Sequence, residues 1–305
     1  MKILSLCTGY GGLDLAVEAV TGGRVITTAD NDRNASRVIT RRFAGIPNLG
    51  DIRHVRWQDW AGVDVITAGY PCQPFSRAGK LKGTDDARHI FPHIANAIRA
   101  VRPRYVVLEN VSAHLILGFT EVQGAMATAG YDTRWVCVRA SDIGACHKRE
   151  RVFIVAANTT DYGYKRHRET WARGVRPENH YRATTHGYSP GFPQFGGLEP
   201  NERDTDRRDS ENTVRDSSES QTWGIYAPAI ERWAGIVGRE APTATTVGRK
   251  LNPIFVEWMM GLSAGWVTDV HIPRGAKLKI LGNGVVPQQA AYALTLLGLG
   301  EESWG

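Results

Sequence analysis

The sequence has few cysteines and no long apolar run. Its four cysteines, Cys7, Cys72, Cys137 and Cys146, have a spacing that fits neither a zinc site nor a dense disulfide framework. We therefore expect reduced thiols, a cytoplasmic protein and no metal site. No apolar run approaches the roughly 18 residues that a membrane span needs. The amino-terminal segment MKILSLCTGYGG is broken by glycines too early for a signal peptide, so we expect neither membrane insertion nor secretion.

A strong charge bias is also missing. The 305 residues carry 37 basic and 31 acidic side chains, which gives a net charge of +6. The pI near 9.2 suits a polyanionic partner, but many proteins without such a partner share it. Hydrophobic residues make up 42% and charged residues 22%, as in ordinary globular proteins. The length suits one sizeable domain together with a smaller one.

The first half of the sequence alternates between strand and helix patterns. Short apolar, β-branched runs predict strands, and the segments between them predict helices. Strands that alternate with helices at this spacing indicate a doubly wound, mostly parallel α/β sheet. The expected strands are Lys2–Cys7, Arg24–Ala29, Val63–Ala68, Tyr105–Leu108 and Arg151–Ala156, and the expected helices are Leu13–Val20, Asn34–Phe43 and Ile90–Val101.

The composition changes after about Ala157. The following stretch is rich in Arg, Asp, Gly, Thr and aromatic residues, and no internal repeat is visible. The polar run Asn201–Gln221 has almost no apolar residue, so we expect an exposed or mobile loop there. Regular patterning returns at Leu251–Trp266, and Leu278–Leu299 predicts a glycine turn at Leu281–Gly284 followed by a helix. We therefore expect a second, smaller unit between two parts of the first.

A glycine-rich turn follows the first expected strand. The segment Cys7-Thr8-Gly9-Tyr10-Gly11-Gly12 lies between a strand and a helix, where glycines let the backbone approach a ligand closely. The second strand ends at Asp30, whose carboxylate can accept hydrogen bonds from two ribose hydroxyls. The same pattern fits a nucleotide-binding oxidoreductase, or a tight turn with no ligand. The turn by itself does not decide between these alternatives.

The third expected strand runs into a loop that contains a cysteine. Cys72 lies between Pro71 and Pro74 in the segment Gly69-Tyr70-Pro71-Cys72-Gln73-Pro74-Phe75-Ser76. The prolines restrict the backbone and so hold the thiol in a fixed direction. Open α/β sheets bind ligands at the carboxyl ends of their strands. The loop position therefore favours a reactive cysteine over the buried, inert thiol that most free cysteines are.

The segment GYPCQPFS resembles the catalytic loop of the DNA (cytosine-5)-methyltransferases and is highly specific. Further segments resemble motifs of that family in the family's order. The match covers about residues 1–157 and 251–299, and in the family the intervening region is the variable target-recognition region. The matching segments are LCTGYGGLDLA, Asp30 in ADND, Gly50-Asp51-Ile52, Glu109-Asn110-Val111, His147-Lys148-Arg149-Glu150-Arg151, a variant at Leu251–Trp266, and Gly282-Asn283-Gly284-Val285-Val286-Pro287.

The resemblance implies a Rossmann-like fold that binds S-adenosylmethionine. Residues 1–157, completed by 272–305, would form the catalytic cofactor-binding domain, and residues 158–271 a smaller target-recognition domain. The implied reaction is methyl transfer from S-adenosylmethionine to C5 of a cytosine flipped out of a specific duplex DNA sequence. We expect a monomer with double-stranded DNA as its partner, and a cognate restriction endonuclease is a further candidate partner.

The resemblance also assigns catalytic roles. Cytosine C5 is a poor nucleophile, and addition of the Cys72 thiolate to C6 would turn the C5–C6 bond into an enamine that attacks a methyl group. The family places Glu109 at the pyrimidine N3 and amino edge, and Arg151 near the cytosine carbonyl. A nearby guanidinium would favour the thiolate. Arg149 alternates with Arg151 on a segment expected to be extended, so both would share one face, although Arg149 also fits a structural ion pair.

Two further groups of contacts follow from the resemblance. Residues Arg77–Arg88 come after the catalytic loop, and their glycines and alternating charges predict a mobile lid over DNA, although solvated side chains are the alternative. The DNA contacts would be Ser76, Arg77, Lys80, Lys82 and His147. The cofactor contacts would be Cys7, Thr8, Gly9, Gly11, Gly12, Leu13, Asp30, Asn31, Asp51, Ile52, Pro71, Asn283, Gly284 and Val285.

Several positions depart from the family pattern. The family commonly has an acidic residue and an aromatic in its first strand, where this chain has Ser5 and Cys7. It usually has glutamine at the position of His147, and Leu251-Asn252-Pro253 and Glu257 also differ. An RNA cytosine-5-methyltransferase, a catalytically silent nucleic-acid-binding relative and a dinucleotide-dependent oxidoreductase stay open as alternatives. The oxidoreductase does not explain GYPCQPFS, and the target DNA sequence is not predicted.

Overall fold

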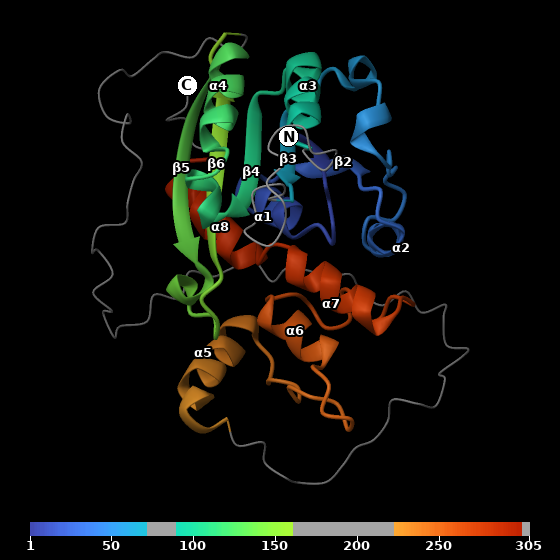
Figure 1. Ribbon diagram of the computed structural model, residues 1–305, viewed down its shortest axis with the longest axis vertical. Helices are drawn as coiled ribbons and strands as arrows, with labels where there is room; N and C mark the ends of the chain where they lie inside the picture. The colour runs from blue at the N-terminus through green and yellow to red at the C-terminus, as the bar shows by residue number, and fades with distance from the viewer. Residues whose placement is uncertain (72–89, 161–222, 301–305) are drawn as a thin grey trace.

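The structure is a computed structural model that describes residues 1–71, 90–160 and 223–300 (Figure 1). The strands are β1 (Lys2–Leu6), β2 (Arg24–Ala29), β3 (Val65–Gly69), β4 (Tyr105–Val111), β5 (Tyr131–Arg139) and β6 (Glu150–Asn158). The helices are α1 (Gly12–Thr21), α2 (Arg33–Arg42), α3 (Phe91–Val101), α4 (Phe119–Thr128), α5 (Ala227–Val237), α6 (Pro253–Met259), α7 (Arg274–Asn283) and α8 (Pro287–Leu296).

The strands form one six-stranded sheet in the order β2-β1-β3-β4-β6-β5. Strand β1 pairs in parallel with β2 and β3, and β3 pairs in parallel with β4. Strand β6 runs antiparallel to both β4 and β5. The mostly parallel sheet that the strand–helix alternation predicts is therefore confirmed. The carboxyl ends of the four neighbouring parallel strands meet along one edge of the sheet.

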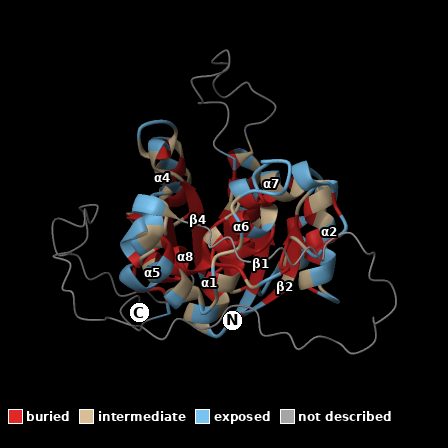
Figure 2. Cartoon of the chain, turned by 90° about the horizontal axis from the view of Figure 1, so that it is seen from below, coloured by how far each residue is buried: buried red, intermediate tan, exposed pale blue. Residues whose placement is uncertain are grey.

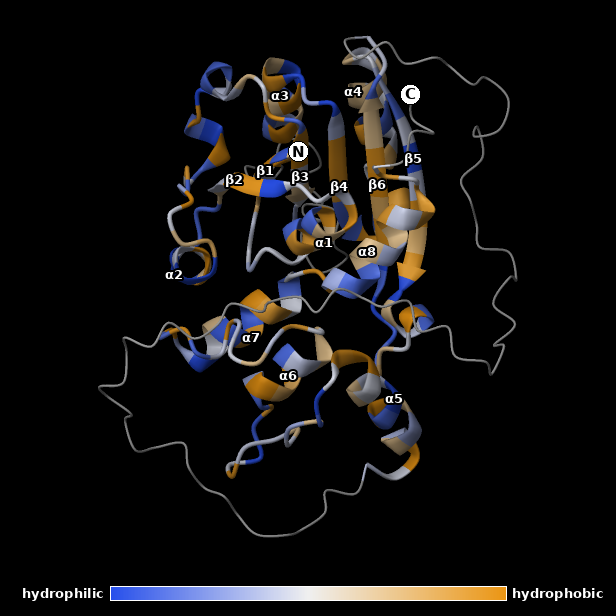
Figure 3. Cartoon of the chain, turned by 180° about the vertical axis from the view of Figure 1, so that it is seen from behind, coloured by the Kyte–Doolittle hydropathy of each residue, from blue (hydrophilic) through white to orange (hydrophobic). Residues whose placement is uncertain are grey.

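Helices cover both faces of the sheet, because successive strand side chains point to opposite faces. One buried cluster joins strand residues to α3 and α4, and a second joins the alternate strand residues to α1 and α8. Figure 2 shows the strands as a buried layer, and Figure 3 shows that β4 is largely hydrophobic. The first cluster contains Leu4, Ile66 and Leu108, and the second contains Ile3, Val65 and Val107.

Helices α5, α6 and α7 lie beyond the carboxyl ends of the parallel strands and share a third buried cluster (Figure 1). Trp233 and Trp258 are fully buried in this cluster, and the Trp233 indole donates to the Trp258 carbonyl at 3.0 Å. Glu257 is also fully buried, and its carboxylate accepts from the backbone N–H groups of Val267 and Thr268. Because these bonds satisfy the carboxylate, Glu257 fixes the loop that follows α6.

One expectation near the carboxyl end is wrong, and several elements were not expected. Leu281–Gly284 is not a turn, because α7 continues to Asn283 and the Gly284 N–H donates to the Ile280 carbonyl at 3.1 Å. Tertiary packing of α7 thus overrides the low helix propensity of Gly282. The sequence pattern did not indicate α4, β5 or α5. The expected polar loop Asn201–Gln221 lies outside the described residues. Within the described part of the chain, no helix is long and apolar enough to cross a bilayer.

Candidate active site

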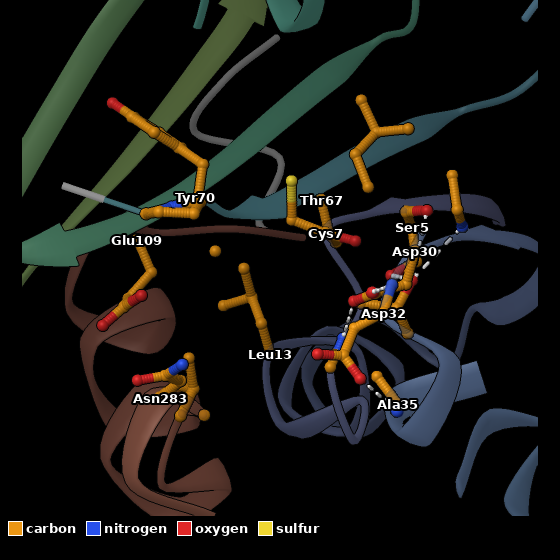
Figure 4. A pocket seen from close by; sticks show the side chains of 18 of the residues that line it. Ser5, Cys7, Leu13, Asp30, Asp32, Ala35, Thr67, Tyr70, Glu109 and Asn283 are labelled. Atoms are coloured by element: carbon orange, nitrogen blue, oxygen red, sulfur yellow. Dashed lines mark hydrogen bonds between the residues drawn. The ribbon is translucent and has the colours of Figure 1, made fainter. Parts of the chain in front are cut away.

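A pocket of about 710 Å³ lies at the carboxyl ends of the parallel strands (Figure 4). Residues at or after the ends of β1, β2, β3 and β4 line it, together with the last turns of α7 and the segment up to Val285. Parallel strands bring residues that are distant in sequence together at this edge. Every predicted cofactor contact except Gly11 lines this pocket, and so do Glu109 and Arg151.

Two glycine-rich segments pack against each other beside the pocket. A Cβ atom at Gly12 would collide with the Val285 carbonyl, and one at Gly284 would collide with the Tyr10 ring. The Tyr10 hydroxyl donates to the Val285 carbonyl at 2.6 Å. The two glycines therefore permit a close approach between the turn after β1 and the end of α7. Gly11 lies instead at the N-cap of α1, with a φ of 84°.

Asp30 lines the pocket directly after β2. Its carboxylate accepts hydrogen bonds from the backbone N–H groups of Gly9 at 2.8 Å and Asp32 at 2.9 Å. These bonds hold the side chain against the turn after β1, and burial raises the pKa of its carboxyl. A carboxylate has about four lone-pair sites, so Asp30 can still accept hydrogen bonds from ligand hydroxyls.

Two ion pairs lie at the same end of the pocket. Asp51 accepts from the Arg53 guanidinium at 2.5 Å and from the Asn31 amide at 3.1 Å, and the Arg53 contact lowers the pKa of the Asp51 carboxyl. Asp32 caps α2 and pairs with Lys279 of α7 at 2.9 Å, which lowers the pKa of Asp32. The sequence did not indicate the Lys279 contact, because its partners are distant along the chain.

Cys7 begins the glycine-rich turn and lies at the pocket wall. Its φ of 53° is in the left-handed region, and its backbone N–H donates to the Ala29 carbonyl at 2.8 Å. Burial, reinforced by Asp30 and Asp51, raises the pKa of the Cys7 thiol to about 12. The thiol is therefore protonated near neutral pH and is not a candidate nucleophile.

Glu109 and Arg151 face each other at the opposite end of the pocket. Glu109 lies in β4 beside Gly69 of β3, and Arg151 lies in β6. The Glu109 Oε1 and Arg151 Nε atoms are 3.0 Å apart. Burial raises the pKa of Glu109 to about 7, against the opposing effects of Arg151 and Arg149. A carboxyl group that titrates near neutral pH can both donate and accept a proton.

Arg149 is not in an extended segment, so that expectation is wrong. Its φ of 34° is in the left-handed region, one residue before β6 begins. Its guanidinium donates to the carbonyl oxygens of Gly282, at 3.0 Å, and of Gly284. Arg149 therefore ties the end of α7 to the start of β6, while its positive charge still lowers the pKa of Glu109.

Among the predicted DNA contacts, His147 lies within the described residues and is not among the residues that line the pocket. His147 Nε2 lies 2.9 Å from the Met259 carbonyl at the end of α6, and burial lowers the pKa of the imidazole. This contact joins the segment before β6 to α6, and a DNA contact by His147 stays a prediction. The remaining predicted residues lie outside the described residues, namely Cys72, Ser76, Arg77, Lys80 and Lys82.

Sequence reasoning missed a buried network next to Glu109. The Asn110 amide donates to the Tyr70 carbonyl at 3.1 Å, and the Tyr70 hydroxyl lies 2.8 Å from His114 Nε2. All three side chains are buried, and His114 belongs to a short 3-10 helix at Ser112–Leu115. The network fixes Tyr70, which directly follows β3 and comes two residues before Cys72 in the sequence. The Glu-Asn-Val match could have marked Asn110, but no local pattern marks His114.

The fold is that of known methyltransferases. The structure matches the S. pombe Dnmt2 methyltransferase with a TM-score of 0.62 and 15% identity, over 98% of this chain and 100% of that chain. It matches a putative DNA modification methyltransferase encoded within a prophage (E. coli) with a TM-score of 0.59 and 16% identity, over 98% of both chains. At these identities the likeness concerns the fold and not the activity.

The sequence places the chain within one family. The model of the C-5 cytosine-specific DNA methylases matches residues 1–170, and the chain belongs to this family. Type II methyltransferase M.NgoMIV of Neisseria gonorrhoeae is 31% identical over 157 residues, which is 50% of each chain. Type II methyltransferase M.HhaI of Haemophilus parahaemolyticus is 32% identical over 160 residues, which is 51% of this chain and 48% of its own. The chain thus matches about half the length of these curated relatives.

Proposed function

We propose that the protein transfers a methyl group from S-adenosylmethionine to C5 of a cytosine in duplex DNA. The observation that carries this proposal is one pocket with a nucleotide-type turn at one end and the buried Glu109, paired with Arg151, at the other. A dinucleotide-dependent oxidoreductase would use the turn but explains neither this pair nor the sequence GYPCQPFS. Membership of the C-5 cytosine-specific DNA methylase family supports the same reaction class.

The pocket residues fit S-adenosylmethionine. The turn that contains Gly9 and Gly12 lets a ligand approach the backbone, and the Asp30 carboxylate suits the ribose hydroxyls. We propose that Asp51 and Ile52 border the adenine, and that Asn283–Val285 close the opposite wall. The volume of about 710 Å³ is in the range of pockets that hold small organic ligands. The cofactor supplies an electrophilic methyl group on a sulfonium.

The chain's own residues would make cytosine C5 nucleophilic. We propose that the Cys72 thiolate adds to C6, which places electron density at C5. Glu109, with a pKa of about 7, would donate a proton or a hydrogen bond to N3 and so withdraw charge from the ring. Arg151 orients Glu109 and would face the cytosine carbonyl. After methylation, a base removes the C5 proton and the thiolate departs, which restores the aromatic ring.

We propose that residues 158–271 recognise the target, and that residues 1–157 and 272–305 form the catalytic domain. The described part of the first segment packs around the third buried cluster. A stacked base cannot expose C6 to a thiol, so the cytosine would leave the duplex at a cost of a few kcal/mol. The DNA contacts would be Ser76, Arg77, Lys80, Lys82 and His147. We propose that the protein acts as a monomer, and that a cognate restriction endonuclease would cut the same sequence in unmethylated DNA.

A domain exchange tests this division. When residues 158–271 are replaced by the corresponding region of a relative, the methylated sequence should change while methyl transfer is retained. Bisulfite sequencing of DNA from expressing cells measures both results. A hybrid that still methylates the original sequence would place base reading outside residues 158–271.

The reaction itself is tested on matched duplex DNA and transfer RNA. The unchanged protein should methylate cytosine in the DNA, and Cys72→Ala should not. Methylation of the transfer RNA alone would replace the proposed substrate with RNA. Cofactor titration with S-adenosylmethionine and NAD separates the proposal from an oxidoreductase, since only S-adenosylmethionine should bind.

The covalent step is tested with duplex DNA that carries 5-fluorocytosine at the target. Fluorine cannot leave as a cation, so a denaturation-resistant protein–DNA adduct should accumulate when S-adenosylmethionine is present. Mass spectrometry should place the adduct on Cys72. Burial raises the pKa of the thiols of Cys7, Cys137 and Cys146, which makes them suitable internal controls. An adduct on any of these three would overturn the assignment of Cys72.

A further inference from the structure

A buried polar cluster lies beside the pocket on the sheet face that α1 covers. Ser5 of β1, Thr67 of β3 and Asp14 of α1 are at most 2% exposed, and all three line the pocket. The Ser5 hydroxyl donates to Asp14 Oδ2 at 2.8 Å, and the Thr67 hydroxyl donates to Asp14 Oδ1. Figure 4 shows Ser5 and Thr67 among the residues that surround the pocket.

Most other carboxylates of the pocket have a cationic partner within the protein. Asp30 is held by backbone N–H groups, and within the described residues the side chains that hydrogen-bond to Asp14 are the neutral hydroxyls of Ser5 and Thr67. In the part of the chain that the structure describes, no lysine, arginine or histidine nitrogen pairs with Asp14. The carboxylates with a cationic partner are Asp51 with Arg53, Asp32 with Lys279, and Glu109 with Arg151.

A buried carboxylate without a counter-charge is electrostatically unfavourable. Burial raises the pKa of Asp14 to about 6, against the hydrogen bonds from Thr67 and Ser5, and Glu18 adds to the rise. The carboxyl group is therefore largely ionised at neutral pH although no cation offsets it. A positively charged ligand group in the pocket would supply the missing counter-charge.

We propose that Asp14 is the counter-charge for the positively charged methionine end of S-adenosylmethionine, which carries a sulfonium and an ammonium group. This inference rests on the proposed function and adds a binding residue to the same pocket. The family pattern has an acidic residue at the position of Ser5, and the Ser5 hydroxyl here contacts Asp14. In this chain the buried carboxylate thus comes from the helix α1 and not from the strand β1.

The variant Asp14→Asn tests this role, because it removes the charge and keeps the size of the side chain. Calorimetry on the full chain would compare S-adenosylmethionine, S-adenosylhomocysteine, which lacks the sulfonium, and methylthioadenosine, which lacks both cationic groups. We expect binding of S-adenosylmethionine to weaken about tenfold or more, and binding of methylthioadenosine to change less than about twofold. If S-adenosylhomocysteine loses affinity to the same extent, the group that Asp14 balances is the ammonium. If its affinity is unchanged, that group is the sulfonium.

Other outcomes overturn the proposal and stay distinct from a failure of the proposed function. Equal losses for all three ligands, or no loss for any, would mean that Asp14 does not sense ligand charge. Glu18→Gln is the matched control, since Glu18 lies one turn further along α1, accepts from the Val25 N–H and does not line the pocket. If the unchanged protein bound none of the three ligands, the proposed function itself would fail.

A charge-swap variant provides an independent test. The double substitution Ser5→Asp with Asp14→Asn returns a carboxylate to the same cluster from the neighbouring strand. It should restore S-adenosylmethionine affinity to within about threefold of the unchanged protein. If Asp14→Asn alone does not fold, the proposal is tested with the double variant instead. A folded swap protein that binds methylthioadenosine but not S-adenosylmethionine contradicts the proposal.

Discussion

The two ends of the pocket bury negative charge in different ways. At one end Glu109 is paired with Arg151, and Arg149 adds a second positive charge nearby. At the other end Asp30 is held by backbone N–H groups, and between the two ends Asp14 is held by the hydroxyls of Ser5 on β1 and Thr67 on β3. None of these groups carries a net charge. At the first end, positive side chains of the protein therefore balance the negative charge of Glu109 without a ligand. Asp14 gains a counter-charge, and Asp30 gains further hydrogen-bond donors, only when a ligand brings a positive charge and hydroxyl groups.

This difference separates two tasks that share one cavity. A preorganised pair does not have to reorganise when charge develops on a reacting base. Carboxylates that lack a counter-charge favour a cationic ligand over a neutral one of similar shape. Substitutions at the Glu109 end should therefore change reaction rates, and substitutions at the Asp30 end should change ligand affinities.

Glu109→Gln gives the sharpest test of that separation. The amide cannot deliver a proton to N3, so methyl transfer should slow by about 10²- to 10⁴-fold. The affinity for S-adenosylmethionine should stay within about twofold, because Glu109 lies at the other end of the pocket. Single-turnover rates and calorimetry measure the two quantities. Glu150→Gln is the control, since Glu150 pairs with Arg139 at the surface. If Glu109→Gln lowered the affinity for S-adenosylmethionine as much as the rate, the two ends of the pocket would not have separate tasks.

Asp14→Asn should change stability with a characteristic pH dependence. Burial in the folded protein raises the pKa of Asp14 from its ordinary value of 3.8 to about 6, so the folded state binds more protons between these pH values. The contribution of Asp14 to stability is present below pH 3.8 and is lost as the pH rises through about 6. Without cofactor, the variant should therefore be more stable than the unchanged protein above pH 6, by up to about 3 kcal/mol.

Denaturant unfolding at two pH values checks this sign. The advantage of Asp14→Asn should be largest near neutral pH and should shrink towards pH 3.8, where the unchanged carboxyl is protonated. A variant that gains stability while losing S-adenosylmethionine affinity would show that the charge serves the ligand and not the fold. A variant that is less stable near neutral pH would make Asp14 an ordinary structural residue.

Asp30→Ala should weaken cofactor binding in a different pattern. Loss of the hydrogen bonds to ribose hydroxyls should cost about 1–3 kcal/mol. Because all three ligands carry the same ribose, S-adenosylmethionine and methylthioadenosine should lose affinity to a similar extent. That pattern contrasts with Asp14→Asn, which should discriminate between them. Unchanged affinity by calorimetry would remove Asp30 from the site.

Local sequence patterns predict the elements whose residues lie close together in the chain. The strand β2 and the turn before α1 follow from apolar runs and glycine positions within a few residues of each other. The same holds for Asp30, which a strand end places at the sheet edge. Glu109 and Arg151 were identified by motif resemblance, and their pairing at 3.0 Å depends on the antiparallel register of β4 and β6.

Contacts between distant segments could not be predicted in the same way. The Tyr10–Val285 hydrogen bond and the Asp32–Lys279 ion pair join residues more than two hundred positions apart. Packing of α7 kept Gly282 helical against its intrinsic preference. Asp14 reads from sequence as an ordinary acidic residue in the first turn of a helix, and only its burial against Ser5 reveals an unbalanced charge.

Tyr70→Phe should have the smallest effect of these substitutions and should leave both ends of the pocket intact. It removes the hydroxyl that lies 2.8 Å from His114 Nε2 and retains the ring contact with Phe91 at 5.6 Å between centroids. The buried imidazole nitrogen loses a partner, so the free energy of unfolding should fall by about 1 kcal/mol. No charge changes, and the affinities for S-adenosylmethionine and methylthioadenosine should stay within about twofold.

Urea unfolding of Tyr70→Phe, His114→Leu and the double variant should show that the second substitution costs less stability once the first partner is gone. If Tyr70→Phe instead weakened binding of the charged ligand selectively, the electrostatic difference between the two ends would extend through β3, and the separation of rate from affinity would have to be abandoned.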